Sequence, residues 1–144
     1  MNGLKQIMYG VTDFALMRAE NGYFVDRTGM IRELEKTSYA MFLRPRRFGK
    51  SLWCSVLQCY YDVDYAARFD EFFGGLDIGL SPTAEHGKYL FIDFNFTGVE
   101  KRFDRVQESF NSYCSLRLDI FAERHSDRLP DGAADAVLRA SSCH

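Results

Sequence analysis

The chain of 144 residues has about the length of one domain, and its composition excludes a disordered polymer, because 47% of the residues are apolar and 15% are aromatic. A formal net charge of −2 gives no overall positive field, so nucleic acid and anionic lipid are not indicated as partners. The sequence has no apolar run long enough for an export signal or a membrane span, and its cysteines show no CxxC spacing. We therefore expect a globular cytoplasmic domain without a zinc site.

The first elements in the chain are expected to be a strand and a short helix. Residues 23–25 are rich in β-forming side chains and predict a strand. Ile31 and Leu34 then share one face of a short helix, which Asp26 or Thr28 is expected to cap.

A buried strand and a longer helix are expected next. The apolar run at residues 39–43 favours a strand, and Pro45 ends it because proline cannot continue a central strand. The period then changes to that of a helix of about three turns, which Asp62 and Asp64 end. The apolar stripe of this helix consists of Leu52, Trp53, Val56, Leu57, Tyr60 and Tyr61.

The second half of the chain predicts one more strand between helices. A short helix stops at Gly74 and Gly75, and the nearly continuous apolar run of residues 88–98 suits a strand buried on both faces. Apolar residues spaced by three or four then predict a long helix over residues 99–121, followed by a helical tail at 133–140. This order of elements predicts an α/β fold with a parallel sheet at its core.

The stretch "FLRPRRFGKSLW", residues 42–53, has the features of a phosphate-binding loop between a strand and a helix. Gly49 permits a close backbone approach, Lys50 supplies a charge for the phosphates, and the Ser51 hydroxyl can hold Mg²⁺. Arg44 stands where the full motif has its first glycine, so the match is confined to Gly-Lys-Ser and its flanks. The alternative is a solvated basic turn, and for Arg46 and Arg47 the choice lies between phosphate or sugar contacts and a solvated pair.

Several motifs in order resemble the AAA-ATPase-like proteins of bacteria, most strongly over residues 8–98. They are "GVTDF" from Gly10, "YFVDRT" from Tyr23, "RPRRFGKSL" from Arg44, "FDEFFGGLDI" and "YLFIDFNFTG". The resemblance implies that residues 1–144 are the N-terminal part of a P-loop NTPase domain that binds ATP and Mg²⁺. In this family Arg44 belongs to the loop. The implied nucleotide contacts are Arg46, Arg47, Phe48, Gly49, Lys50, Ser51 and Leu52, with Ser51 also at the metal.

Hydrolysis requires a second strand that ends in a magnesium-orienting Asp, usually followed by a Glu. Asp93 is the one candidate, but Phe94 follows it, so Asp93 is either a magnesium ligand or a structural residue at a strand end. The resemblance places the family's own "IDEYD" segment further along, beyond residue 144, and its nuclease-like region after that. We therefore expect an ATPase domain incomplete at its C-terminus, with an open sheet edge for a protein partner. The alternatives are a small ATPase that uses Asp93 and a non-catalytic interaction module.

Overall fold

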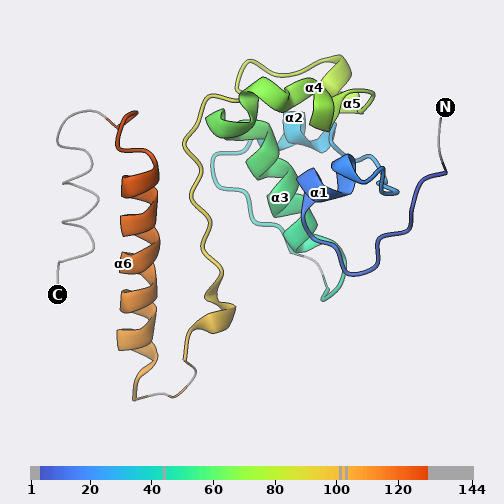
Figure 1. Ribbon diagram of the computed structural model, residues 1–144. Helices are drawn as coiled ribbons and strands as arrows, with labels where there is room; N and C mark the ends of the chain where they lie inside the picture. Colours follow the sequence, from blue (N-terminus) through green and yellow to red (C-terminus); the bar gives the residue numbers. More distant parts are fainter. Residues whose placement is uncertain (1–3, 44, 101, 103, 130–144) are drawn as a thin grey trace. The chain divides into compact units, whose positions relative to one another are not determined.

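The computed structural model describes residues 4–43, 45–100, 102 and 104–129 (Figure 1). The chain divides into two compact units, Met1–Phe91 and Ile92–His144, and each is described by itself.

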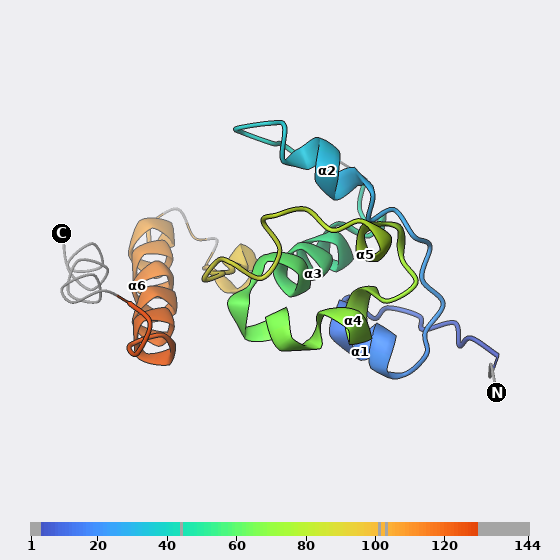
Figure 2. The ribbon, with the colours of Figure 1, turned by 90° about the horizontal axis from the view of Figure 1, so that it is seen from above.

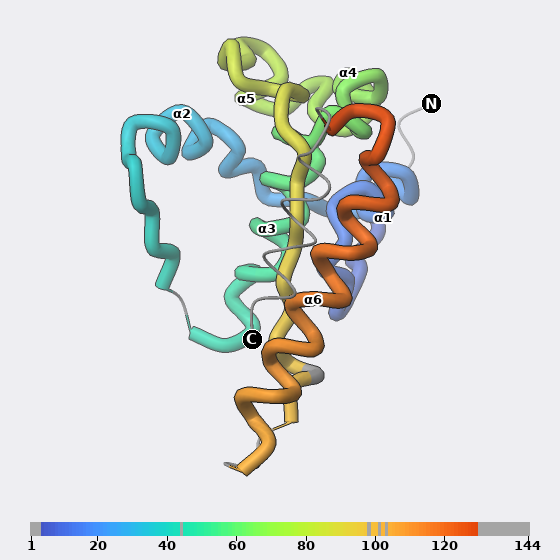
Figure 3. Tube along the Cα trace, turned by 90° about the vertical axis from the view of Figure 1, so that its left-hand side faces the viewer, coloured from blue at the N-terminus to red at the C-terminus, as the bar shows by residue number. Residues whose placement is uncertain are grey.

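The first unit is a set of short helices around the longer helix α3, Lys50–Tyr61. The others are α1 (Phe14–Ala19), α2 (Met30–Leu34), α4 (Phe69–Phe73), α5 (Asp77–Leu80) and the 3₁₀ helix η1 (Val63–Arg68). Figures 1 and 2 show α1 and α4 against α3, and Figure 3 shows the loop that returns from α2 to the start of α3.

Local chemistry explains where several of these helices begin and end. The Asp13 side chain accepts a hydrogen bond from the Leu16 N–H and so caps α1. Asp62 ends α3, as the sequence predicts, and its side chain accepts from the Asp64 N–H to start η1. Gly74 ends α4, which confirms the predicted stop.

The core of the first unit is aromatic and is built on the apolar stripe of α3. Val56 and Tyr60 of α3 pack with Phe14 from α1 and with Phe72 and Phe73 from α4, and each of these side chains is at most 1% exposed. The Phe14 and Phe73 ring centroids lie 5.3 Å apart, and those of Tyr60 and Phe73 lie 5.4 Å apart. Burial of each such side chain contributes about 1.5–3 kcal/mol, so this cluster is the main source of stability in the unit.

The expected parallel sheet is wrong, because the part of the chain that the structure describes contains no β-strand. Its β-type pairing is limited to two isolated bridges, between Gln6 and Gly22 and between Asp62 and Tyr89. Apart from the bridge at Tyr89, the segments 23–25, 39–43 and 88–95 are not assigned to strands. Tyr39 is 95% exposed and Leu43 is 81% exposed, so the run expected to be a buried strand lies at the surface.

The short helix with Ile31 and Leu34 is confirmed as α2, but the predicted caps are wrong. Gly29 occupies the cap position and no side chain caps the helix. Asp26 and Thr28 instead hold α5: the Asp77 N–H donates to Asp26 Oδ2 at 2.7 Å, and the Ile78 N–H donates to Thr28 Oγ1 at 3.2 Å.

The second unit pairs an extended segment with a long helix. The predicted helix is present as α6, Val106–Arg124, but it begins later than expected, after the 3₁₀ turn η2, Phe96–Gly98. The Asn95 N–H donates to the Tyr113 hydroxyl at 2.8 Å, and Phe96 stacks on Phe110 with centroids 5.1 Å apart. The expected tail helix at 133–140 lies outside the described residues.

Candidate functional site

The start of α3 presents backbone N–H groups to its surroundings. Gly49 is the residue before the helix and adopts a left-handed conformation, with φ 75° and ψ 21°. The first hydrogen bond of the helix runs from the Trp53 N–H to the Gly49 carbonyl at 2.9 Å. The preceding N–H groups have no acceptor within the helix, no side chain caps them, and the first turn has no acidic residue. Together with the helix dipole, these N–H groups favour an anion at this position.

The loop before α3 is basic and contains a strained residue. Arg46, Arg47 and Lys50 are all exposed. Arg47 has φ 67°, a left-handed conformation that side-chain-bearing residues rarely adopt. The chain therefore turns sharply into the helix through two left-handed residues, Arg47 and Gly49.

A hollow of about 580 Å³ opens at this turn, and we call it the loop hollow. One wall consists of Arg47 and of residues 49–52, which include Lys50 and Ser51. The other wall is residues 7–12, from the N-terminal segment. Among the described residues that line this hollow, none carries a carboxylate. Its charged side chains are thus basic, and its potential favours an anion.

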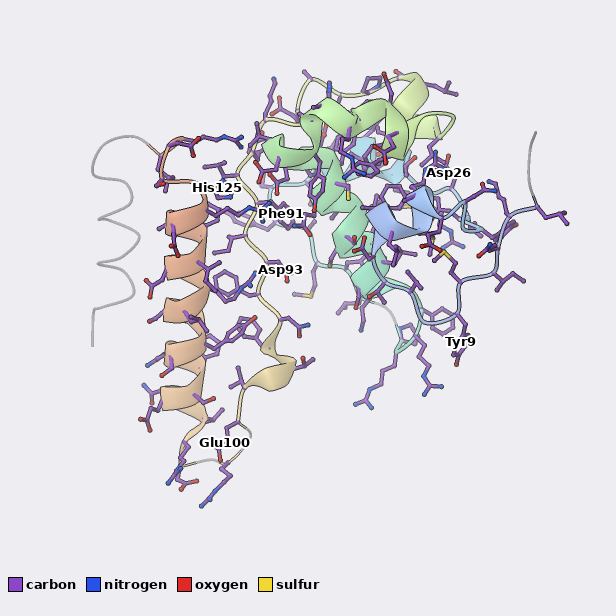
Figure 4. All side chains as sticks on the ribbon, viewed as in Figure 1. Tyr9, Asp26, Phe91, Asp93, Glu100 and His125 are labelled. Carbon is purple, nitrogen blue, oxygen red and sulfur yellow. The ribbon has the colours of Figure 1, made fainter. Side chains whose placement is uncertain are left out.

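The N-terminal wall is held in place from both ends. Before it, the Tyr23 N–H donates to the Gln6 carbonyl at 2.7 Å. After it, the Phe14 N–H donates to Ser55 Oγ on α3 at 2.9 Å. The wall turns at Gly10, whose φ of 77° suits glycine. Its side chains Ile7 and Tyr9 are 90% and 94% exposed, and Figure 4 labels Tyr9.

The predicted site residues line two neighbouring hollows, and Gly49 and Leu52 line both of them. Arg47, Gly49, Lys50, Ser51 and Leu52 line the loop hollow. Phe48 lines a second hollow of about 130 Å³, which also contains Phe42 and Trp53. Arg46 is exposed beside them in the loop, and Arg44 lies outside the described residues.

Asp93, the residue predicted as a possible magnesium ligand, belongs to the second unit and is labelled in Figure 4. It is exposed, and its backbone carbonyl accepts a hydrogen bond from Arg117 Nε at 3.1 Å. Within the described ranges, no three His, Cys, Asp or Glu side chains are arranged to hold a metal ion.

Sequence reasoning missed the N-terminal wall of the loop hollow. The signal was present in "GVTDF", where Gly10 makes the turn, Asp13 caps α1 and Phe14 enters the core. These roles fix the segment just before α1, and the motif itself contributes Gly10, Val11 and Thr12 to the lining.

Asp26, from the motif "YFVDRT", has a structural role and is labelled in Figure 4. Its Oδ1 atom accepts hydrogen bonds from the Thr28 N–H at 2.8 Å and the Thr28 hydroxyl at 2.7 Å. Burial raises the pKa of Asp26, but the hydrogen bonds from Thr28 and Asp77 outweigh it, so the pKa lies below its usual value. The ionised carboxylate thus joins residues 26–28 to α5.

None of the helices in the described ranges combines the length and the apolar character that crossing a bilayer requires.

Comparison with protein-family models matches residues 8–143 to the AAA-ATPase-like family, whose description is "Predicted AAA-ATPase". The match begins just before Gly10 and continues well past residue 98, where the motifs quoted above end. Comparisons with curated proteins and with solved structures found no match.

Proposed function

The chain belongs to the predicted AAA-ATPase family, and we propose that it binds ATP with Mg²⁺ in the loop hollow, with the phosphates at the start of α3. One observation carries the proposal. An uncapped helix of 12 residues begins directly after a left-handed glycine, and Lys50 and Ser51 from its first turn line a hollow without carboxylates. This combination supplies N–H donors, a helix dipole and the charge of the Lys50 side chain to one anion.

Several groups around the start of α3 are proposed to contact the phosphates and the metal ion. The N–H groups of the first turn donate to phosphate oxygens, and the Lys50 ammonium contributes a point charge. Ser51 is exposed at the edge of the hollow, so its hydroxyl is available to hold Mg²⁺. One protein hydroxyl fits this ion because Mg²⁺ at nucleotide sites takes most of its ligands from phosphate and water. Arg47 adds a further cation from the loop.

The base and sugar are proposed to lie along the N-terminal wall. Ile7 and Tyr9 of this wall are almost fully exposed, and an aromatic face stabilises a stacked base by about 1–3 kcal/mol. The wall has an apolar and aromatic character, whereas the opposite wall is basic. A nucleotide, with an aromatic base at one end and phosphates at the other, matches this asymmetry better than inorganic phosphate does.

Titration calorimetry with Mg-ATP tests the proposal on the wild type, Lys50→Ala and Lys36→Ala. Lys36 is the matched control, because it is an exposed lysine whose ammonium pairs with Glu33 on α2, 2.7 Å away. We expect Lys50→Ala to weaken binding at least about tenfold, and Lys36→Ala to leave it unchanged. Binding that is equal in both variants, or no binding to the wild type, would overturn the proposal.

A further inference from the structure

Another hollow, distinct from the two described above, lies at the opposite end of α3 from the loop hollow. It has a volume of about 460 Å³ and is lined by Glu35, Tyr61, Glu85, Tyr89 and Phe91. We call it the aromatic–acidic hollow, because three aromatic rings and two carboxylates form its lining. All five residues belong to the first unit, which ends at Phe91 (Figure 4).

Two of the aromatic rings, those of Tyr61 and Tyr89, meet edge to face and are not stacked. The centroids of Tyr61 and Tyr89 lie 5.9 Å apart with an angle of 83° between the ring planes. This edge-to-face pair keeps ring faces in different directions, and Tyr89 remains 48% exposed. Ring faces attract cations through the ring quadrupole, within about 6 Å of the centroid.

The two carboxylates are fixed by hydroxyl groups. Glu35 Oε1 accepts hydrogen bonds from the Tyr61 hydroxyl at 3.0 Å and from Thr83 Oγ1 at 2.8 Å. Glu85 Oε2 accepts from the Tyr89 hydroxyl. Each carboxylate is therefore held next to the hydroxyl of a tyrosine, and its negative charge lies close to an aromatic ring.

The surroundings of Tyr61 and Tyr89 raise the pKa of both hydroxyls. Burial, together with the hydrogen bond and negative charge of Glu35, raises the pKa of Tyr61 far above its usual value. The hydrogen bond to Glu85, with burial, raises the pKa of Tyr89. At neutral pH the two tyrosines therefore add no charge to the lining.

One cation lies next to this hollow without lining it. Lys88 Nζ is 3.9 Å from Glu85 Oε1, and the lysine side chain is 56% exposed. An exposed pair at this distance is weak, so Lys88 neutralises Glu85 only in part. The side-chain hydrogen bonds of Glu35 described above come from two neutral hydroxyls, and neither of these donors is a cation.

We propose that the aromatic–acidic hollow binds a small organic cation of the substituted-ammonium class. The alkyl groups of such a cation would pack against the faces of Tyr61, Tyr89 and Phe91, while its charge lies near Glu35 and Glu85. A neutral ligand of the same shape would gain the packing and lose both electrostatic contributions. The site is independent of the proposed ATP site, since the length of α3 separates them.

Choline and its neutral isostere 3,3-dimethylbutan-1-ol provide the test, with binding followed by NMR titration of the full chain. We expect choline to bind with a dissociation constant in the millimolar range and the isostere to bind about tenfold more weakly. Equal binding of the two compounds, or no saturable binding of choline, would overturn the proposal.

Variants locate the choline site. Glu35→Gln keeps an acceptor for Tyr61 and removes only the charge, so we expect choline to bind several-fold more weakly. Glu33→Gln, on the same stretch of chain but outside the lining, is the matched control and should leave binding unchanged. Lys88→Gln removes the competing cation and should strengthen binding.

The ring requirement and the separation from ATP are tested in the same titration. Tyr61→Phe retains the ring and should retain binding, whereas Tyr61→Leu should abolish it. Lys50→Ala should leave choline binding unchanged whether or not it weakens ATP binding. Loss of choline binding in Lys50→Ala, or its retention in Tyr61→Leu, would contradict the assignment.

Discussion

Arg47 allows conformational strain and charge in the loop to be separated by mutation. Its φ of 67° places a side-chain-bearing residue in the left-handed region, which costs about 1–2 kcal/mol. Glycine avoids this cost but loses about 0.5–1 kcal/mol more chain entropy on folding. Arg47→Gly should therefore raise the free energy of unfolding by roughly 0.5–1 kcal/mol, or the melting temperature by about 2–4 °C.

The same substitution should weaken ATP binding, because the guanidinium lines the loop hollow. The arginine is exposed, so its loss should cost about 1 kcal/mol, roughly a fivefold increase in the dissociation constant. Stability and affinity are then expected to change in opposite directions. Arg47→Lys, which keeps the charge and the strain, should change both quantities much less.

Urea unfolding and titration calorimetry measure the two effects, and Arg46→Gly is the matched control. Arg46 neighbours Arg47 in the same exposed loop but is not among the described residues with positive φ. Glycine at position 46 should destabilise the protein by a few tenths to about 1 kcal/mol. If both glycine variants change the urea midpoint in the same direction, the strain assigned to Arg47 is refuted.

Three further outcomes are expected. Gly49→Ala should destabilise the loop by about 1–2 kcal/mol in urea unfolding, because alanine must adopt φ 75°; an unchanged midpoint would contradict the role of the left-handed turn. The pKa of Asp26 is lower in the folded than in the unfolded state, so the folded state binds fewer protons. Its stabilisation is present above the unfolded pKa and is lost as pH falls through the folded one; Asp26→Asn should remove this part of the slope of unfolding free energy against pH. Tyr9→Ala should weaken binding of ATP roughly tenfold and binding of inorganic triphosphate little, which competition titrations measure; equal losses would contradict stacking of the base.

The helices of the first unit could be predicted from the sequence because their signals are local. The stripe from Leu52 to Tyr61 has the period of a helix, and the structure places α3 over Lys50–Tyr61. The ends of α3 at Asp62 and of α4 at Gly74 could also be predicted, because a capping aspartate and a glycine act on neighbouring residues in the chain. For these elements the sequence alone was sufficient.

The strands could not be predicted in the same way, because a strand depends on a partner elsewhere in the chain. Residues 39–43 have the apolar composition of a buried strand, yet Tyr39 and Leu43 lie exposed without a ladder of hydrogen bonds. At 88–95 the described pairing is the single bridge between Tyr89 and Asp62. Apolar composition predicts that a segment can be covered, but it does not specify which segment covers it.

In the candidate site, too, the part formed by contiguous residues could be predicted, whereas the part that depends on a contact between distant residues could not. Gly49, Lys50 and Ser51 are contiguous, so the sequence predicted their common position at a helix start. The N-terminal wall is more than 30 residues away in the chain, and its position depends on the bond from the Phe14 N–H to Ser55 Oγ. Sequence reasoning had no means of pairing these two residues.

The two walls of the loop hollow are joined through the core. Phe14, directly after the N-terminal wall, is fully buried against Phe73 and is hydrogen-bonded to α3 through Ser55. The same helix supplies Lys50 and Ser51 at its exposed start and Tyr60 to the core near its end. The aromatic core that stabilises the first unit therefore also sets the distance between its basic wall and its aromatic wall. A ligand that contacts both walls would bind to a site that is preorganised by folding, so binding would require little further ordering of the chain.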